Sequence, residues 1–78
     1  AKVLALHGFD DPMVSPDDVL QLERELTEAE VDWQMHVYGQ TAHAFTNPLA
    51  NDPNFGTVYK KQSADRAWLA IQQFFAEL

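Results

Sequence analysis

The chain has 78 residues, a formal net charge of −7 and a hydrophobic fraction of 46%, which together predict one small globular domain rather than a disordered segment. The negative charge argues against nucleic acid and anionic membranes as partners, and the longest apolar run is too short to cross a bilayer. The chain contains no cysteine, which excludes disulfides and cysteine metal ligands.

The first predicted strand, Lys2 to His7, contains the continuous apolar run Val3 to Leu6. A run without polar alternation is typical of a parallel strand that is covered on both faces. Such a strand needs neighbours, and this chain offers few. The chain starts at Ala1, without methionine and directly on the strand, which is typical of a fragment or a trimmed chain, while N-terminal processing is the alternative explanation.

The predicted first helix begins after the loop Gly8 to Val14. Ser15 suits the N-cap, Pro16 suits the first helical position, and two aspartates follow near the positive end of the helix dipole. Apolar residues with helical spacing predict one buried stripe, opposite a face of glutamates that we interpret as solvent-exposed. The stripe consists of Val19, Leu22, Leu26 and Ala29.

A second predicted strand runs from Asp32 to Tyr38, where apolar and polar residues alternate. This alternation is typical of a strand at or near the edge of a sheet. Strand, helix and strand in this order form a βαβ unit, which is expected to be parallel and right-handed. The sequence therefore predicts an α/β fold with a parallel sheet.

The rest of the chain is predicted to form a long functional loop, Gly39 to Lys61, and a final helix, about Gln62 to Leu78. The helix has a strong 3.6-residue period, which suggests Trp68 and the pair Phe74–Phe75 as core anchors against the sheet. Together the elements predict a βαβ-loop-α arrangement.

Asp11 and His43 are the candidate catalytic residues. Each follows a predicted strand, and parallel strands end at the same edge of a sheet, where open α/β folds place ligands. A carboxylate beside an imidazole nitrogen fixes the tautomer and leaves the other nitrogen to act as a base. Each residue alone has a simpler interpretation, because an aspartate before Pro12 can form a turn and a loop histidine can be merely solvated. Their pairing at corresponding strand ends favours catalysis, whereas His7 and His36 have no such partner.

The chain resembles the carboxyl-terminal part of the dienelactone hydrolase family, within the α/β-hydrolase fold, over essentially all 78 residues. The resemblance rests on four motifs in order: His7-Gly8-x-x-Asp11-Pro12-x-Val14, Val31-Asp32-Trp33-Gln34 leading into Tyr38-Gly39, His43-Ala44-Phe45-Thr46-Asn47-Pro48, and Ala64-Asp65-Arg66-x-Trp68 before Phe74-Phe75. It implies that Asp11 is the acid and His43 the base of a catalytic triad in an ester or lactone hydrolase. It implies no cofactor and no metal.

The family's nucleophile, a cysteine or serine in an earlier elbow, has no counterpart here, because the chain contains no G-x-C-x-G or G-x-S-x-G. We therefore expect residues 1–78 to be a single partial domain that is inactive alone and lacks the N-terminal part of the hydrolase domain. Asn47 stands where dienelactone hydrolases have an arginine for the substrate carboxylate, so the resemblance implies a neutral ester or lactone. Phe45 and Asn47 are the candidate substrate-binding residues. Phe55 and Tyr59 either line the same pocket or pack against their own domain.

A different kind of function stays open as an alternative. The chain can be a non-catalytic α/β module that completes its sheet by self-association into a homo-oligomer, because an open sheet edge recruits a partner strand. In a third interpretation, a separate chain supplies the nucleophile. The acidic composition and the absence of a targeting signal favour the cytoplasm.

Overall fold

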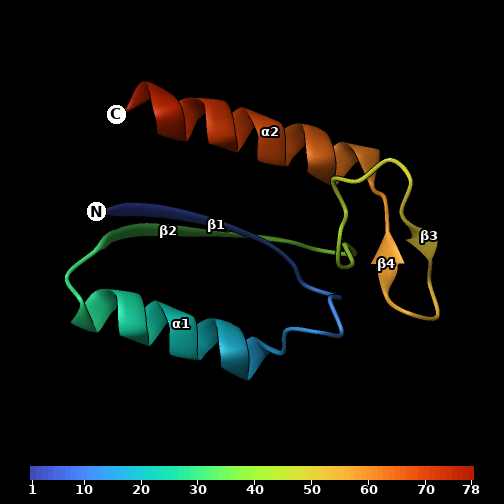
Figure 1. Ribbon diagram of the computed structural model, residues 1–78, viewed down its shortest axis with the longest axis horizontal. Coiled ribbons are helices and arrows are strands. Elements are labelled where there is room, and N and C mark those ends of the chain that lie inside the picture. Colours follow the sequence, from blue (N-terminus) through green and yellow to red (C-terminus); the bar gives the residue numbers. More distant parts are fainter.

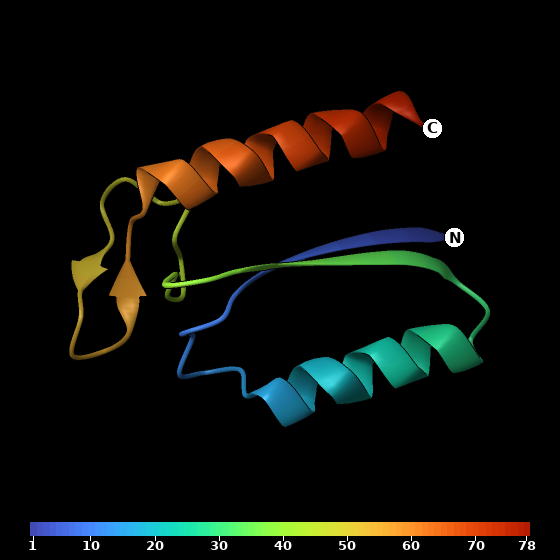
Figure 2. The ribbon, with the colours of Figure 1, turned by 180° about the vertical axis from the view of Figure 1, so that it is seen from behind.

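Two parallel strands lie between two helices, and a small hairpin stands at one end of this frame (Figure 1). The computed structural model describes all 78 residues. The elements in chain order are β1 (Lys2–Gly8), α1 (Pro16–Glu28), β2 (Asp32–Tyr38), β3 (Asn51–Asp52), β4 (Thr57–Val58) and α2 (Lys61–Ala76). Seen from both sides, α1 covers one face of the β1–β2 pair and α2 covers the other (Figures 1 and 2).

Strands β1 and β2 pair in parallel, from Lys2 opposite Asp32 to Gly8 opposite Tyr38. Helix α1 makes the crossover between them, as parallel pairing requires. The predicted parallel βαβ unit is therefore confirmed. Both strands end at the same edge of the sheet, and β1 is paired along one edge only.

Helix α1 begins where the sequence predicts. The Ser15 hydroxyl accepts a hydrogen bond from the Asp18 amide at 3.2 Å, and the Asp18 carboxylate accepts one from the Ser15 amide at 3.0 Å. This capping box satisfies two amides that the first helical turn leaves without partners. The predicted apolar stripe is only partly covered, because Val19 and Leu26 are half-buried while Leu22 is exposed.

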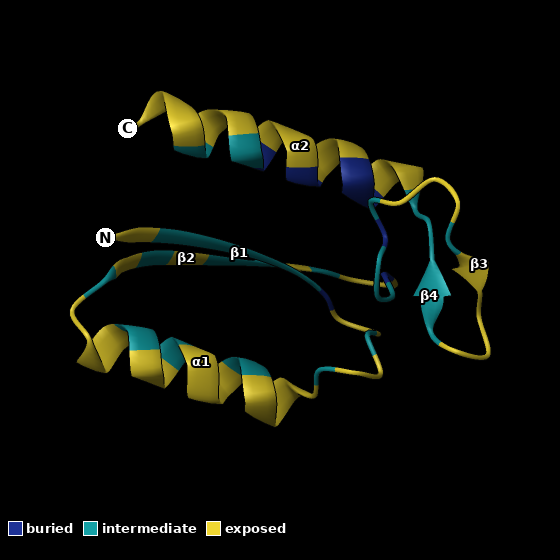
Figure 3. Cartoon of the chain, viewed as in Figure 1, coloured by how far each residue is buried: buried dark blue, intermediate teal, exposed yellow.

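The core is small and lies mainly between α2 and the segment that follows β2. Only 7 of the 78 residues are buried. Figure 3 shows the buried positions gathered at the start of α2 and in the chain that runs beneath it. They include the apolar residues Phe45, Ala64, Ala67 and Ala70, and the hydroxyl residues Thr41 and Ser63.

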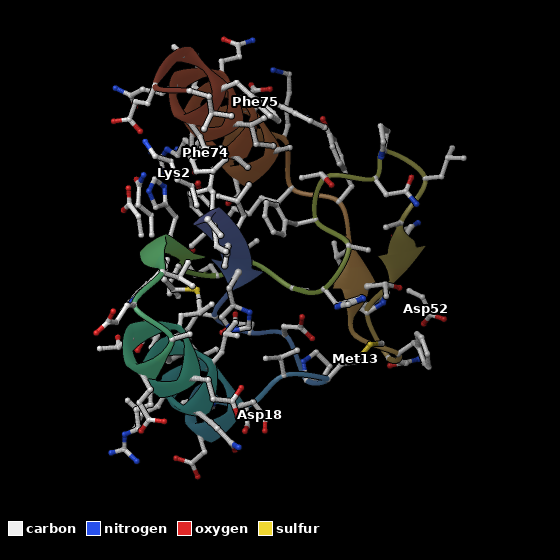
Figure 4. The ribbon with its side chains drawn as sticks, turned by 60° about the vertical axis from the view of Figure 1, so that its left-hand side comes forward. Lys2, Met13, Asp18, Asp52, Phe74 and Phe75 are labelled. Carbon is white, nitrogen blue, oxygen red and sulfur yellow. The ribbon has the colours of Figure 1, made fainter.

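The expectation that aromatic residues anchor α2 is wrong for two of the three. Trp68 is 52% exposed and Phe75 is 63% exposed, while the side that packs inward consists of alanines and Ser63. Phe74 is half-buried and lies on the side of α2 that faces β1 (Figure 4). The physical reason is the width of the sheet: two strands cannot cover the whole apolar face of a 16-residue helix.

The chain exposes more surface than its mass predicts. Its accessible surface is 5493 Å². A compact monomer of this mass exposes roughly 4,800 Å². Large apolar residues of α2 contribute to the exposed surface, among them Trp68, Leu69 and Phe75. Neither helix has the length and hydrophobicity that a membrane span requires.

Candidate active site

Asp11 and His43 form a hydrogen-bonded pair at the end of the β1–β2 sheet. Oδ2 of Asp11 lies 2.8 Å from Nδ1 of His43. The two side chains differ in accessibility, since that of Asp11 is 7% exposed and that of His43 is 43% exposed. With Nδ1 engaged by the carboxylate, Nε2 has no protein partner and is the nitrogen available to a substrate or nucleophile.

The turn after β1 fixes the direction of the Asp11 carboxylate. Its Oδ1 accepts a hydrogen bond of 2.8 Å from the Met13 amide, and the Asp11 amide donates to the Gly8 carbonyl at 3.1 Å. Asp11 therefore combines the two interpretations given to it, that of a turn residue and that of a partner of His43. One carboxylate oxygen closes the turn around Pro12, and the other meets His43.

The pKa of the Asp11 carboxyl lies below its ordinary value. Burial acts in the opposite direction and raises it, but the hydrogen bonds from His43 and from the Met13 amide, together with the electrostatic interactions with His43 and His7, lower it by more. The carboxylate is therefore held ionised, as a group that is to stabilise an imidazolium must be.

The segment after β2 passes close over the end of β1, and glycine makes this approach possible. A Cβ on Gly8 would lie 2.7 Å from the Ala42 carbonyl oxygen and would also collide with the Thr41 carbonyl. The Asp10 amide donates to that Thr41 carbonyl at 2.9 Å, which ties the two loops together. The sequence analysis did not identify Thr41, and the glycine at a strand end was its only local signal.

A buried hydroxyl pair fixes the same segment to α2. The Thr41 and Ser63 side chains are hydrogen-bonded at 2.7 Å, and the Thr41 hydroxyl also lies 2.8 Å from the Gly39 carbonyl oxygen. Neither residue is more than 2% exposed. The sequence placed Ser63 only at the start of a helix, and nothing in its neighbourhood indicated a partner 22 residues away.

The segment predicted as one long loop contains the hairpin β3–β4, in which Asn51 faces Val58 and Asp52 faces Thr57. The hairpin holds the backbone of the histidine. The His43 amide donates to the Gly56 carbonyl at 3.0 Å, and the Val58 amide donates to the His43 carbonyl at 3.2 Å. His43 is thus bound on both sides of its peptide unit before its side chain meets Asp11.

A cleft of about 450 Å³ opens at this end of the molecule. Asp11, His43 and Phe45 form part of its wall, and Trp68 and Ile71 of α2 also line it. Phe45 is itself buried and packs on Tyr38, with ring centroids 5.6 Å apart. The cleft therefore joins one polar pair to a mostly apolar wall, as small-molecule sites do.

The other candidate residues lie elsewhere. Asn47 is exposed and does not line the cleft, and its Oδ1 accepts a hydrogen bond of 3.0 Å from the Leu49 amide. The substrate contact expected of Asn47 therefore stays a prediction. Phe55 is exposed in the hairpin, and Tyr59 does not reach the cleft either. His7, which had no expected role, lines the cleft close to Asp11. The structure gathers no group of three or more His, Cys, Asp or Glu side chains that could hold a metal ion.

The chain matches one protein family and a solved structure, but no curated protein. The sequence model of the dienelactone hydrolase family matches residues 1–78. Among solved structures, the chain is similar to the crystal structure of a dienelactone hydrolase-like promiscuous phosphotriesterase from metagenomic libraries, with a TM-score of 0.91 and 36% sequence identity. That match covers 99% of this chain and 33% of the other, so the present chain spans about a third of its neighbour's length. Comparison with curated proteins finds no match.

Proposed function

This chain belongs to the dienelactone hydrolase family, and on that premise we propose that it supplies the acid and the base of a triad that hydrolyses carboxylic esters or lactones. The observation that carries the proposal is the 2.8 Å hydrogen bond between Asp11 Oδ2 and His43 Nδ1. It leaves Nε2 of His43 free at the cleft. A base held in this way by a buried carboxylate suits acyl transfer, in which a proton must be removed and then returned.

In the proposed mechanism, Nε2 of His43 accepts and returns the protons that are transferred. His43 takes the proton of a cysteine or serine nucleophile as that group attacks the ester carbonyl, and the imidazolium that forms is stabilised by Asp11. The tetrahedral intermediate collapses, the C–O bond breaks, and Nε2 returns the proton to the departing alkoxide. Water then attacks the acyl-enzyme, gives its proton to Nε2, and the carboxylic acid leaves as the nucleophile regains a proton.

The nucleophile belongs to another part of the protein in this proposal. The serines of the chain are engaged, since Ser15 caps α1 and Ser63 is bonded to Thr41 in the core. We propose that residues 1–78 form the C-terminal part of a hydrolase domain and that the nucleophile elbow and oxyanion hole belong to its N-terminal part. The neighbour's greater length supports this division. Residues 1–78 alone are then expected to be inactive.

The proposed substrate is a small neutral ester or lactone. The apolar wall formed by Phe45, Trp68 and Ile71 supports an uncharged acyl or alcohol group. No cation stands at Asn47, where the family's arginine would meet a carboxylate. A neutral phosphotriester is a second substrate to assay, because the similar structure is described as that of a promiscuous phosphotriesterase.

The test of this function uses a protein that contains residues 1–78 together with the rest of the hydrolase domain. His43→Ala and Asp11→Asn should each lower kcat for a neutral aryl ester by about 10³- to 10⁴-fold. His36→Gln is the matched control, because His36 lies on β2, outside the cleft, and should leave kcat unchanged. If His43→Ala kept most of the esterase activity, the triad assignment would be wrong.

A second candidate function has its own supporting observation. Strand β1 is unpaired along one edge, and apolar side chains on α2 stand in solvent beside it. A second copy that paired its β1 with this edge would make a four-stranded sheet and cover α2. Sedimentation velocity of the 78-residue chain decides the matter: a dimer at micromolar concentration is expected from self-association, and a folded monomer contradicts it.

A further inference from the structure

Gly56 occupies a position in the hairpin that no other residue fits. Its φ of +92° lies in the range that side chains disfavour. In addition, a Cβ at this position would lie 2.7 Å from Cδ of Pro12 and would collide with Cγ of the same ring. The Pro12 ring therefore fills the space that a side chain at position 56 would need. The two residues are in direct contact although the chain between them is long.

This contact joins the loop of the acid to the segment of the base. Pro12 directly follows Asp11 in the chain. Gly56 accepts the hydrogen bond of the His43 amide at 3.0 Å, and Val58 donates to the His43 carbonyl at 3.2 Å. Each member of the pair is thus one peptide bond or one hydrogen bond away from the Pro12–Gly56 contact.

The turn that presents Gly56 is itself fixed. The Gly56 amide donates to the Asp52 carbonyl at 3.0 Å, and the Phe55 amide lies 3.2 Å from the Asp52 side-chain oxygen Oδ1. Met13, which follows Pro12, lies on the same side of the molecule as Asp52 of the hairpin (Figure 4). The surface that the acid loop rests on is therefore an ordered turn rather than a free loop tip.

We propose that Gly56 is a positioning residue, and that the β3–β4 hairpin sets the spacing at which the Asp11 carboxylate and the His43 ring can form their hydrogen bond. The hairpin fixes the histidine through its backbone and limits the approach of the acid loop through the proline ring. The catalytic meaning of this spacing rests on the proposed function, but the spacing itself is a property of this chain and can be measured without a substrate.

The experiment compares three variants of the full chain by NMR. Gly56→Ala places a methyl group against Pro12. Gly39→Ala is the matched glycine control, because nothing lies within 4 Å of the Cβ it adds. Combining Gly56→Ala with Pro12→Ala removes the ring atoms that the new methyl group would meet and keeps the positive φ. Comparison of the single and double variants therefore separates the contact from the backbone strain.

Two resonances report the spacing. One is the Nδ1 proton of His43, which is protected from exchange only while Asp11 accepts it. The other is the Asp11 carboxyl carbon, whose titration gives the pKa of that group. The titratable groups that face Asp11 are His43 and, from β1, His7. Gly56→Ala should abolish the Nδ1 proton signal and raise the pKa of Asp11 towards its ordinary value, while His7 stays in place.

Recovery of both resonances in the double variant, with Gly39→Ala like the parent chain, supports the positioning role. If the His43 Nδ1 proton signal and the pKa of Asp11 were unchanged in Gly56→Ala, the positioning role would be overturned. If Gly56→Ala does not fold, the double variant decides: a folded chain with an intact pair supports the role, and failure of the double variant as well overturns it in favour of backbone strain alone.

Kinetics in the complete hydrolase domain separate this inference from the proposed function. Loss of the Asp11–His43 spacing should lower kcat by about 10- to 100-fold with little change in KM, because the pair acts on the reacting atoms rather than on substrate affinity. Altered resonances without any loss of kcat would refute the triad and leave the positioning role intact. Unaltered resonances with a loss of kcat would refute the positioning role.

Discussion

Gly8 and Thr41 lie in backbone contact, with the Thr41 carbonyl group directly against the Cα of Gly8. A Cβ at position 8 would lie 2.9 Å from the Thr41 carbonyl carbon and 2.7 Å from the next carbonyl oxygen, that of Ala42. The contact lies where the segment leading to His43 crosses the end of β1. It brings the base within reach of Asp11, which lies three residues after Gly8 along the other loop.

Gly8→Ala should therefore separate these two segments. The atoms that oppose the new methyl group belong to the backbone and cannot rotate away, so we expect a loss of about 1–3 kcal/mol in the free energy of unfolding. Urea denaturation followed by circular dichroism measures the loss. Gly39→Ala adds its methyl group to open space and should change the stability by less than about 1 kcal/mol. Equal stability of the two variants would contradict the contact.

Ser63→Ala tests the buried hydroxyl pair. The substitution leaves the Thr41 hydroxyl without its partner on α2, in a place that is closed to water. We expect a cost of about 1–2 kcal/mol, since Thr41 keeps its bond to the Gly39 carbonyl. Gln72→Ala changes an exposed position of the same helix and should cost less than about 0.5 kcal/mol. If Ser63→Ala left the free energy of unfolding unchanged, the hydroxyl pair would make no contribution to stability.

Ala67 and Trp68 are neighbours in α2, but substitution of Ala67 should destabilise the fold more than substitution of Trp68. Ala67 has no exposed surface, so Ala67→Leu must push α2 away from the segment beneath it and should cost about 1–3 kcal/mol. Trp68 is half in solvent, and Trp68→Ala should cost less than Ala67→Leu in spite of the larger change in volume. Thermal unfolding of both variants gives the order, and the reverse order would restore Trp68 as a core anchor.

The stability of the chain should depend on pH through Asp11. Its pKa is lowered in the folded state, so its contribution is complete above the unfolded pKa of about 4 and is lost as the pH falls through the lower folded pKa. The difference in unfolding free energy between the parent chain and Asp11→Asn should therefore shrink as the pH falls below about 4. Urea titrations at several pH values measure it, with Asp10→Asn as control, because no hydrogen bond involves the Asp10 side chain. A difference that stays the same at low pH would contradict the stabilising role of the carboxylate.

The strands, the first helix and the approach of Asp11 to His43 follow from local features of the sequence. The apolar run Val3 to Leu6 and the Ser15–Pro16 helix start predict a βαβ unit, and parallel strands necessarily end at one edge. Short loops after the two strands bring Asp11 and His43 to the same edge, whereas the hairpin contacts that hold their final spacing cannot be read from these local features. These predictions succeed because each depends on residues that are close along the chain.

The features that the sequence does not predict depend on distant residues. Helical periodicity identifies the apolar face of α2, but it does not indicate how wide the sheet beneath is, and so Trp68 and Phe75 were expected in the core. Strands of two residues, such as β3 and β4, are too short for any alternation to be visible. The contacts of Thr41 with Ser63 and of Pro12 with Gly56 join segments whose local sequences carry no sign of each other.

The hairpin has one further consequence, for changes in chain length. Both backbone bonds that hold His43 come from its second half, at Gly56 and Val58, while Leu49 before its first strand is 89% exposed. Residues inserted at Leu49 would therefore lengthen the chain at an exposed position without interrupting either bond. The backbone position of His43 therefore does not depend on the chain length at Leu49, and a peptide inserted there should leave the hydrogen bond between Asp11 and His43 in place.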